Sequence, residues 1–263
     1  MTPSASVRFR SVLPTFVVDD VRATAEQHRD LYGFRIAFVL GGGSGEFAIV
    51  DLAEGQGFHL KRGDPAKARR NARIQTGAKD AYVRYGGVDA LHARVKQAGG
   101  KIVSGIDERP WGMRELRVED RNGLVIVFGE DASGRSPRDE RRTAPTFLVS
   151  DLRASASFYE KTLGFAPGLW ADPPIYGVHA RDGVEVHHTP APAGVALPRN
   201  AGGARVWDAF VEVDGIEAVR DELRAKGGNF RRDLETTDYE MREIEIVDAD
   251  GYALCFGEPV GGW

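Results

Sequence analysis

The chain has 263 residues, of which 35 are basic and 39 acidic, giving a net charge of −4. This length suits two domains of roughly 100–150 residues each. No Lys/Arg-rich stripe stands beside regularly placed aromatic residues, which disfavours nucleic acid as a partner. The single cysteine, Cys255, excludes an internal disulfide and suits a reducing cytoplasm, and no run approaches the ~18 apolar residues of a membrane span. We therefore expect a cytoplasmic protein that binds neither nucleic acid nor a membrane.

The sequence contains an internal repeat as long as a whole domain. Its landmarks return first at a spacing of 131 residues and later at 128: Pro14-Thr15-Phe16 with Pro145-Thr146-Phe147, Gly33-Phe34 with Gly164-Phe165, Met113-Arg114-Glu115 with Met241-Arg242-Glu243, and Phe128-Gly129-Glu130 with Phe256-Gly257-Glu258. A solenoid unit would repeat every 20–50 residues or so, so this period marks a tandem duplication. We expect one domain over residues 8–130, a polar linker over 131–142 and a second domain over 143–258, with the ligand site where the copies face each other.

Taken in chain order, each copy is predicted to contain two strand-helix-strand-strand-strand units. In the first copy we expect strands at 12–18, 46–52, 58–61 and 80–85, helices at 21–32 and 88–98, and a closing hairpin at Asn122-Gly123. In the second we expect helices at 152–163 and 216–226, strands at 175–180, 184–188 and 208–213, and hairpin turns at Asp182-Gly183 and Asp250-Gly251. Asp214 and Glu217 are spaced as a helix-capping pair. The chain therefore holds four βαβββ units.

One stretch between these elements is strongly basic. Its cations are Lys61, Arg62, Lys67, Arg69, Arg70 and Arg73. We interpret the stretch as a solvated loop, and the alternative is a site for an anionic group.

The nested βαβββ order and three sequence stretches resemble the vicinal-oxygen-chelate superfamily, within it the glyoxalase/bleomycin-resistance type. The stretches are residues 151–165, Pro110-Trp111-Gly112-Met113-Arg114-Glu115, and the turn at 120–123. The resemblance implies an α+β fold of two tandem domains, each a pair of βαβββ units forming a cupped mixed sheet flanked by helices. It selects no single activity, because the superfamily holds metal-dependent lyases, isomerases, dioxygenases and thiol transferases beside metal-free drug-binding proteins.

Metal-dependent members of this superfamily take His or Glu ligands from four strand positions in each site. By the resemblance, the first-strand place falls on Leu13 and Ala144, the last-strand place on Val127 and Cys255, the place before the second helix on Asp80 and Asp208, and the middle-strand place on His59 and on Glu185, His187 or His188. A catalytic ion normally needs three protein ligands. We therefore expect no metal cofactor, and the alternative is a divalent ion held in the second copy by a histidine, Asp208 and Cys255.

The remaining candidates each have a structural alternative. Asp80 and Asp208 could contact a ligand or transfer a proton, or could accept backbone N–H bonds where a strand begins. His187 and His188 are adjacent on a strand, so only one can face a cavity. Aromatic residues near loops could hold a planar ligand or fill the core: Trp111, Trp170, Tyr176, Trp207 and Tyr239, of which Trp111 and Tyr239 occupy equivalent places. Cys255 is expected to be a buried, inert thiol.

The leading hypothesis is a metal-independent small-molecule-binding protein of the bleomycin-resistance type, acting as a monomer or homodimer. It would sequester a bulky cationic or aromatic natural product or drug and so give antibiotic resistance. The expected ligand-binding residues are Asp80, Tyr82, Trp111, His59, Trp207, Asp208, Phe210, Tyr239 and His187. The first alternative is an enzyme of the same fold, lyase, isomerase or dioxygenase-like, using a degenerate metal site or Asp208 with His187 as acid and base. The second is a regulatory or scaffold subunit whose clefts are filled by side chains.

Overall fold

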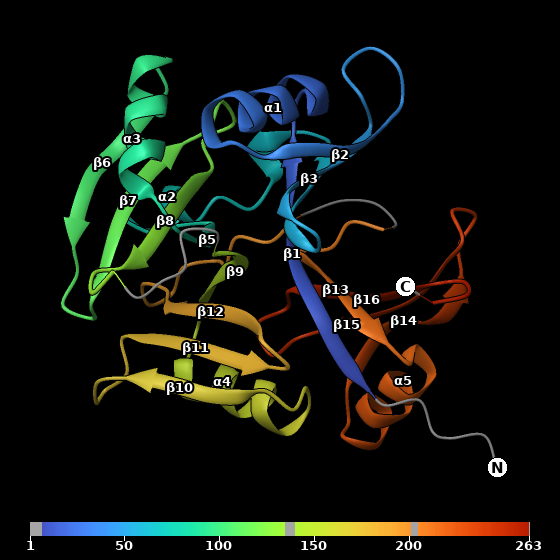
Figure 1. Ribbon diagram of the computed structural model, residues 1–263. Coiled ribbons are helices and arrows are strands. Elements are labelled where there is room, and N and C mark those ends of the chain that lie inside the picture. Colours follow the sequence, from blue (N-terminus) through green and yellow to red (C-terminus); the bar gives the residue numbers. More distant parts are fainter. Residues whose placement is uncertain (1–6, 135–139, 201–204, 263) are drawn as a thin grey trace.

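A computed structural model describes residues 7–134, 140–200 and 205–262 (Figure 1). Within these residues the chain forms four βαβββ units. The first unit is β1 (Arg8–Val18), α1 (Val21–Gln27), β2 (Arg35–Leu40), β3 (Phe47–Ala53) and β4 (Gln56–Arg62); the second is β5 (Ala81–Tyr85), α3 (Val88–Gln97), β6 (Lys101–Glu108), β7 (Met113–Glu119) and β8 (Val125–Asp131). The third is β9 (Arg141–Val149), α4 (Leu152–Lys161), β10 (Ala166–Trp170), β11 (Tyr176–Arg181) and β12 (Val184–Pro190); the fourth is β13 (Ala209–Asp214), α5 (Ile216–Ala225), β14 (Asn229–Thr236), β15 (Met241–Val247) and β16 (Ala253–Pro259).

These strands form two mixed, eight-stranded sheets in the part of the chain that the structure describes, which confirms the α+β fold. Their orders are β14-β15-β16-β13-β1-β4-β3-β2 and β10-β11-β12-β9-β5-β8-β7-β6. Of the expected linker, residues 135–139 lie outside the described residues, and the parts on either side run directly into β8 and β9. None of the helices in the described ranges is both long and apolar enough to cross a membrane.

Each sheet joins one unit from the first copy to one unit from the second. β1 pairs in parallel with β4 of its own unit and antiparallel with β13 of the fourth unit. β9 pairs in the same two ways with β12 and with β5 of the second unit. In Figure 1, β1 runs from beside α5 to beside α1 and so spans both copies. The middle of each sheet is therefore a seam between the copies.

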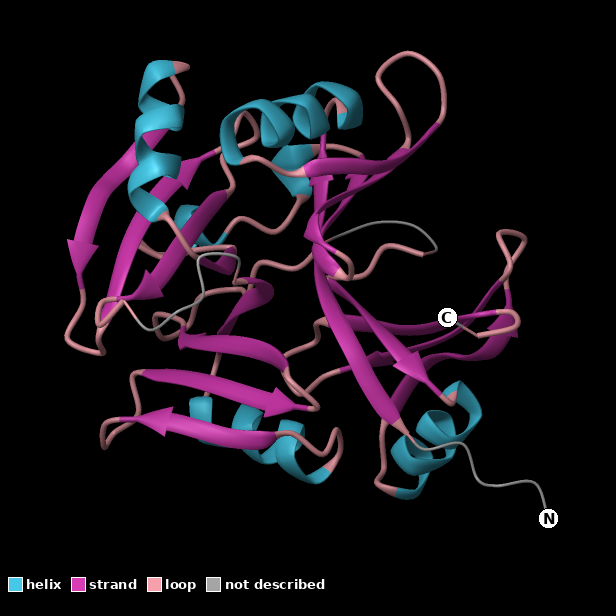
Figure 2. Ribbon diagram, viewed as in Figure 1, coloured by secondary structure: helices cyan, strands magenta, loops and turns pink. Residues whose placement is uncertain are grey.

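The hydrophobic cores, in contrast, follow the copies. One core lies under α1 and α3 and includes Phe16, Phe58 and Phe128. The other lies under α4 and α5 and contains Phe147 and Phe256, joined by Phe9 from the start of β1. The helices cover the outer faces of the sheets (Figure 2), so the opposite, inner faces are left for other contacts.

Side-chain caps fix where the helices begin. Asp20 and Asp151 accept backbone N–H bonds at the starts of α1 and α4. The expected cap of α5 by Asp214 and Glu217 is wrong. Gly215 precedes α5 with a φ of 73°, and its N–H and that of Ile216 are accepted by the carboxylate of Glu258 from β16. Asp214 instead pairs with Arg10 across the seam.

The solvated-loop interpretation of the basic stretch is wrong for Arg69 and Arg70, which are completely buried. Arg69 lies between the rings of Phe16 and Phe147, 5.4 and 5.2 Å from their centroids, so it is flanked by equivalent residues of the two copies. Its Nη1 donates to the carbonyl oxygens of Asp80 and Thr146, and its Nε lies 3.7 Å from Asp208 Oδ1. One guanidinium thus links both copies.

Asp80 and Asp208 are buried beside Arg69 at the starts of β5 and β13. Asp80 accepts N–H bonds from Asn71 and Val125, and Asp208 accepts them from Asn200 and Ala253. Burial raises the pKa of both carboxyl groups, while the charge of Arg69 acts in the opposite direction. Both carboxylates are therefore held by backbone groups and one shared cation.

Replacing Arg69 with methionine should destabilise the protein by about 3–5 kcal/mol, because two buried carboxylates would lose their only common cation. Urea unfolding followed by circular dichroism measures the loss. Arg153→Met is the matched control, since Arg153 is exposed and pairs only with the exposed Asp172. Equal unfolding midpoints for the two variants would contradict a stabilising role of Arg69 beside the two buried aspartates.

Candidate functional site

The inner face of each sheet presents four equivalent positions across the seam between the copies. On the first sheet these are Leu13, His59, Phe210 and Cys255, from β1, β4, β13 and β16. On the second sheet they are Ala144, His187, Tyr82 and Val127, from β9, β12, β5 and β8. Leu13 pairs with Phe210 and Phe210 with Cys255, just as Ala144 pairs with Tyr82 and Tyr82 with Val127. We call these two sets the first and second inner faces.

The first inner face is closed by its own side chains. Trp207, Phe210, Ala253 and Cys255 form a buried apolar cluster with Leu13. His59 packs against Phe47 and Phe210 with ring centroids 5.1 Å apart in each case, and burial lowers its pKa to about 3. Three residues that were expected to bind a ligand therefore contact one another or the core: His59, Trp207 and Phe210.

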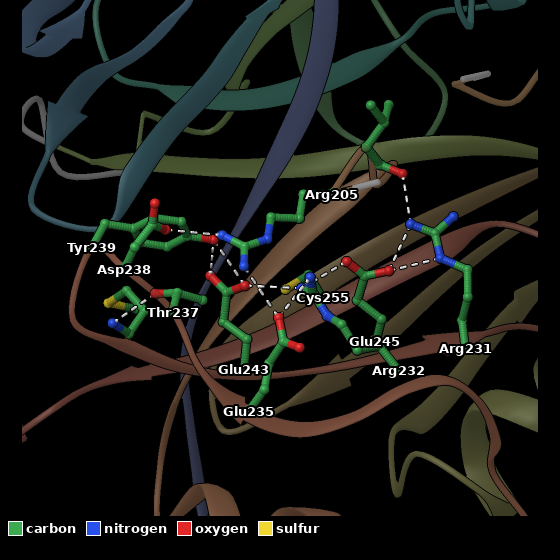
Figure 3. A network of polar contacts seen from close by, with 12 residues as sticks. Arg205, Arg231, Arg232, Glu235, Thr237, Asp238, Tyr239, Glu243, Glu245 and Cys255 are labelled. Carbon is green, nitrogen blue, oxygen red and sulfur yellow. Dashed lines mark hydrogen bonds and ion pairs between the residues drawn. The ribbon is translucent and has the colours of Figure 1, made fainter. Parts of the chain in front are cut away.

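A network of ion pairs lies over this cluster (Figure 3). Arg232 bridges Glu243 and Glu245 at 2.9 and 2.8 Å. Tyr239 donates from its hydroxyl to Glu243 at 3.0 Å, and Arg205 lies over the Tyr239 ring. Cys255 is completely buried beneath these charges, and burial raises the pKa of its thiol. The expected burial of the Cys255 thiol is therefore observed.

The second inner face has the same layout with polar groups. Tyr176 Oη and His187 Nδ1 are 2.7 Å apart, and His187 Nε2 lies 3.3 Å from Glu185. Arg84 lies 3.7 Å from the same Glu185 carboxylate. The His187 ring is 5.3 Å from the Tyr82 ring, in the place where His59 meets Phe210. Burial lowers the pKa of His187, so the ring is neutral at pH 7.

Five aromatic side chains cross this face as a band, which we call the aromatic belt: Trp111, Tyr82, His187, Tyr176 and Trp170. Trp170 contacts Tyr176 at 5.5 Å, and Trp111 donates from Nε1 to Glu115, which neighbours Tyr82. The tryptophans at the two ends are 57% and 48% exposed, for Trp111 and Trp170 respectively. The belt therefore runs from solvent, through a buried centre, to solvent.

Lys79 lies on this belt. Its Nζ is 4.5 Å from the centroid of Tyr176 and 5.5 Å from that of Tyr82. Within the described part of the chain, Nζ has no hydrogen bond or ion pair. Burial lowers its pKa to about 8. The equivalent residue of the first inner face is Trp207, which covers Phe210.

Comparison with known proteins agrees with this arrangement. Residues 143–256 match the family model described as the Glyoxalase/Bleomycin resistance protein/Dioxygenase superfamily. This match lies within the second copy. The internal repeat gives the first copy the same topology, so the chain is a tandem two-domain protein of this vicinal-oxygen-chelate fold.

Solved structures show a similar two-domain fold. Glyoxalase I from Zea mays is similar with a TM-score of 0.67 and 17% identity, over 96% of this chain and 92% of that one. A putative dioxygenase from Bacillus subtilis gives a TM-score of 0.67 at 12% identity, over 95% of this chain and 85% of that one. No curated protein sequence matches the chain significantly. These identities support the fold and leave the activity open.

The residues present do not fit the divalent metal that the superfamily implies. Each inner face offers one imidazole at its four positions, accompanied by Leu13, Phe210 and Cys255 or by Ala144, Tyr82 and Val127. Among the described residues, no three His, Cys, Asp or Glu side chains come together in a way that could hold an ion. Three such ligands are what a catalytic site of this kind normally requires.

Asp80 and Asp208, expected at metal-ligand positions, accept backbone N–H bonds two residues before Tyr82 and Phe210. Tyr82 and Phe210, not the aspartates, pair across the seam with the first-strand positions. The proposed second-copy set is also dispersed. His187 lies on the second inner face and Cys255 on the first, while Asp208 lies in the centre with Arg69.

His187 and His188 point to opposite faces of β12, as successive residues of a strand do. His187 joins the belt, whereas His188 is buried under α4 against Tyr159 and His179. The sequence-based list missed Lys79 and Glu115. Alignment of the copies carries a signal for both, because Lys79 stands where Trp207 was selected, and Glu115 recurs as Glu243.

The second inner face has little preformed empty space. A cavity lined by Tyr82, Arg84, Ala144 and Glu185, with Ser11 from β1, has room for about one water molecule. A larger ligand must therefore lie along the exposed ends of the belt or displace side chains.

Tag-free protein dialysed against Mn²⁺, Ni²⁺ or Zn²⁺ should retain far less than one ion per chain, because neither inner face supplies three donors. Elemental analysis measures the content. His59→Ala and His187→Ala serve as a matched pair, and neither should change it. One ion per chain that disappears only in His187→Ala would show a metal site on the second inner face.

Proposed function

We propose that the protein binds a planar small molecule on its second inner face without a metal. The observation that carries this proposal is the aromatic belt, which combines two exposed tryptophans with a centre of tyrosine and histidine. Aromatic faces contribute large apolar areas and prefer stacked or edge contacts with other rings. Sequestration of a toxic natural product by this face would lower its free concentration, which is the physical basis of resistance.

The sequence suggested a cationic or an aromatic ligand, and the charge around the belt favours an anionic or neutral aromatic ligand over a cationic one. Five cations, Lys79, Arg84, Arg109, Arg117 and Arg142, surround three carboxylates, Asp107, Glu115 and Glu185. Each carboxylate already neighbours an arginine, so a cationic ligand would find no free partner. An anionic ligand would meet the surplus positive charge.

The first inner face has a different role in this proposal. Its cluster is buried, and Lys61, Arg205, Arg231 and Arg232 are balanced by Glu235, Asp238, Glu243 and Glu245. We therefore assign it a scaffold role, which is the filled-cleft alternative applied to one half of the molecule. One ligand site per chain follows.

The enzyme alternative is supported by one feature, the contact of His187 with Tyr176 and Glu185. A neutral histidine held by a carboxylate and a phenol is able to accept a proton. Asp208 takes no part in that arrangement because it lies beside Arg69. Turnover of a bound ligand that is lost in His187→Gln while binding remains would favour catalysis.

A matched set of three probes tests the binding proposal: naphthoate, naphthylmethanol and naphthylmethylammonium. Calorimetric titration should give affinities that decrease in this order, because the ring is constant and only the charge changes. Trp111→Ala should weaken naphthoate binding about tenfold, or ~1.4 kcal/mol, through loss of one aromatic contact.

The control is Tyr239→Ala, which truncates the equivalent exposed residue of the first inner face. It should leave the affinity unchanged. Equal losses in Trp111→Ala and Tyr239→Ala, or tightest binding of the cationic probe, would contradict the proposed site.

A further inference from the structure

We propose that Lys79 captures carbonyl-bearing ligands on the second inner face as a reversible imine. This inference rests on the proposed function and adds a substrate class to it, namely planar aldehydes or ketones. It is carried by the position of one amine on the aromatic belt, between two tyrosine rings.

The surroundings of Lys79 Nζ separate this group from the other lysines of the chain. Of the seven lysines, Lys101 and Lys226 form exposed ion pairs with Glu119 and Glu222. Lys61, on the first inner face, donates to the carbonyl oxygen of Arg205 at 2.6 Å. Lys79 contacts only the faces of Tyr82 and Tyr176 within the described residues. Among the residues that the structure describes, its amine therefore has no acceptor to release before it reacts.

The electrostatic environment keeps part of this amine unprotonated near neutral pH. Desolvation lowers the pKa of Lys79 to about 8, and the nearby Arg109 and Arg117 act in the same direction against Glu115. The aromatic faces offset only part of the lost hydration of an ammonium ion. An amine that is desolvated and close to other cations is the usual setting of a nucleophilic lysine.

The reaction balances without a further reagent. The neutral Nζ adds its lone pair to the carbonyl carbon as the C=O π bond breaks, and one Nζ proton passes to the oxygen to give a neutral carbinolamine. Loss of water then leaves a C=N bond, which takes up a proton to become an iminium ion. Addition of water reverses each step. Burial and Glu115 raise the pKa of the Tyr82 hydroxyl, so this group keeps its own proton beside the reacting carbon.

Selectivity for planar carbonyl compounds follows from the belt. A ring lying along Trp170 and Tyr176 would bring a substituent carbonyl to the amine, which is 4.5 Å from the Tyr176 centroid. The iminium charge replaces the ammonium charge that the tyrosine faces already accommodate. Capture therefore changes the covalent state of the site and leaves its net charge the same.

Reductive trapping tests the inference. Full-length protein is treated with naphthaldehyde and cyanoborohydride, and labelled peptides are counted by mass spectrometry. At about pH 7, Lys79 should be labelled at least about tenfold faster than the exposed lysines, because a larger fraction of its amine is neutral. It should also be labelled faster than Lys61, whose amine is held by the carbonyl oxygen of Arg205. The labelling rate should rise with pH and level off above a midpoint near 8, the pKa of Lys79.

Lys79→Arg is the decisive variant, since it keeps the positive charge and cannot form an imine. It should lose the rapid labelling, while Lys61→Arg, a change on the first inner face, should retain both the rapid labelling at Lys79 and naphthoate binding. Labelling of Lys79 no faster than Lys61 would overturn the inference, even with naphthoate bound. Absence of naphthoate binding with rapid labelling at Lys79 would instead remove the proposed function and leave the reactive amine.

Discussion

The structure depends on one buried cation shared by two copies of the same domain. Arg69 lies between Phe16 and Phe147, which are equivalent residues, and approaches a strand entrance of each copy. A homodimer would place two guanidinium groups at this symmetric position, and like charges this close in a buried site are strongly unfavourable. Gene fusion removes the difficulty, because the second copy is free to hold another residue. The central ion group therefore requires the two copies to differ.

Because the fused copies are free to differ in sequence, their two inner faces can differ as well. Both keep a glutamate beneath an exposed ring, Glu115 with Trp111 and Glu243 with Tyr239. Around this common feature, the first inner face carries a closed apolar cluster. The second carries the aromatic belt with its polar contacts. A packed first face stabilises the seam through burial, so the second face can expose aromatic and charged groups at a lower risk to the fold. As a consequence, the first inner face serves as the scaffold and the second as the binding surface.

Much of this fold follows from local sequence patterns, whereas the pairing of units does not. Periodicity and turn residues predicted the helices after Asp20 and Asp151 and the hairpin at Asp182-Gly183, because these signals act over a few residues. The exchange of units across the copies depends on long-range packing, which has no local signal. Arg69 was misjudged for a related reason: burial of a charge depends on partners far along the chain, here Thr146 and Asp208. The absence of metal-binding side chains at Leu13 and Val127 could be read from the sequence, because it depends only on which residues stand there.

The replacement of metal ligands need not end the binding of oxygen-bearing ligands. A divalent ion in such a site would supply a concentrated positive charge for carbonyl or carboxylate oxygens. On the second inner face, side chains supply the positive charge: Arg84 on β5, Arg142 on β9, and Lys79 just before β5. A dispersed charge binds more weakly and with less strict geometry than an ion, since no single group brings the whole charge to one point. Retention of Tyr82 and His187 at the seam then favours recognition through a ring face, with the cations selecting the ligand's polar end.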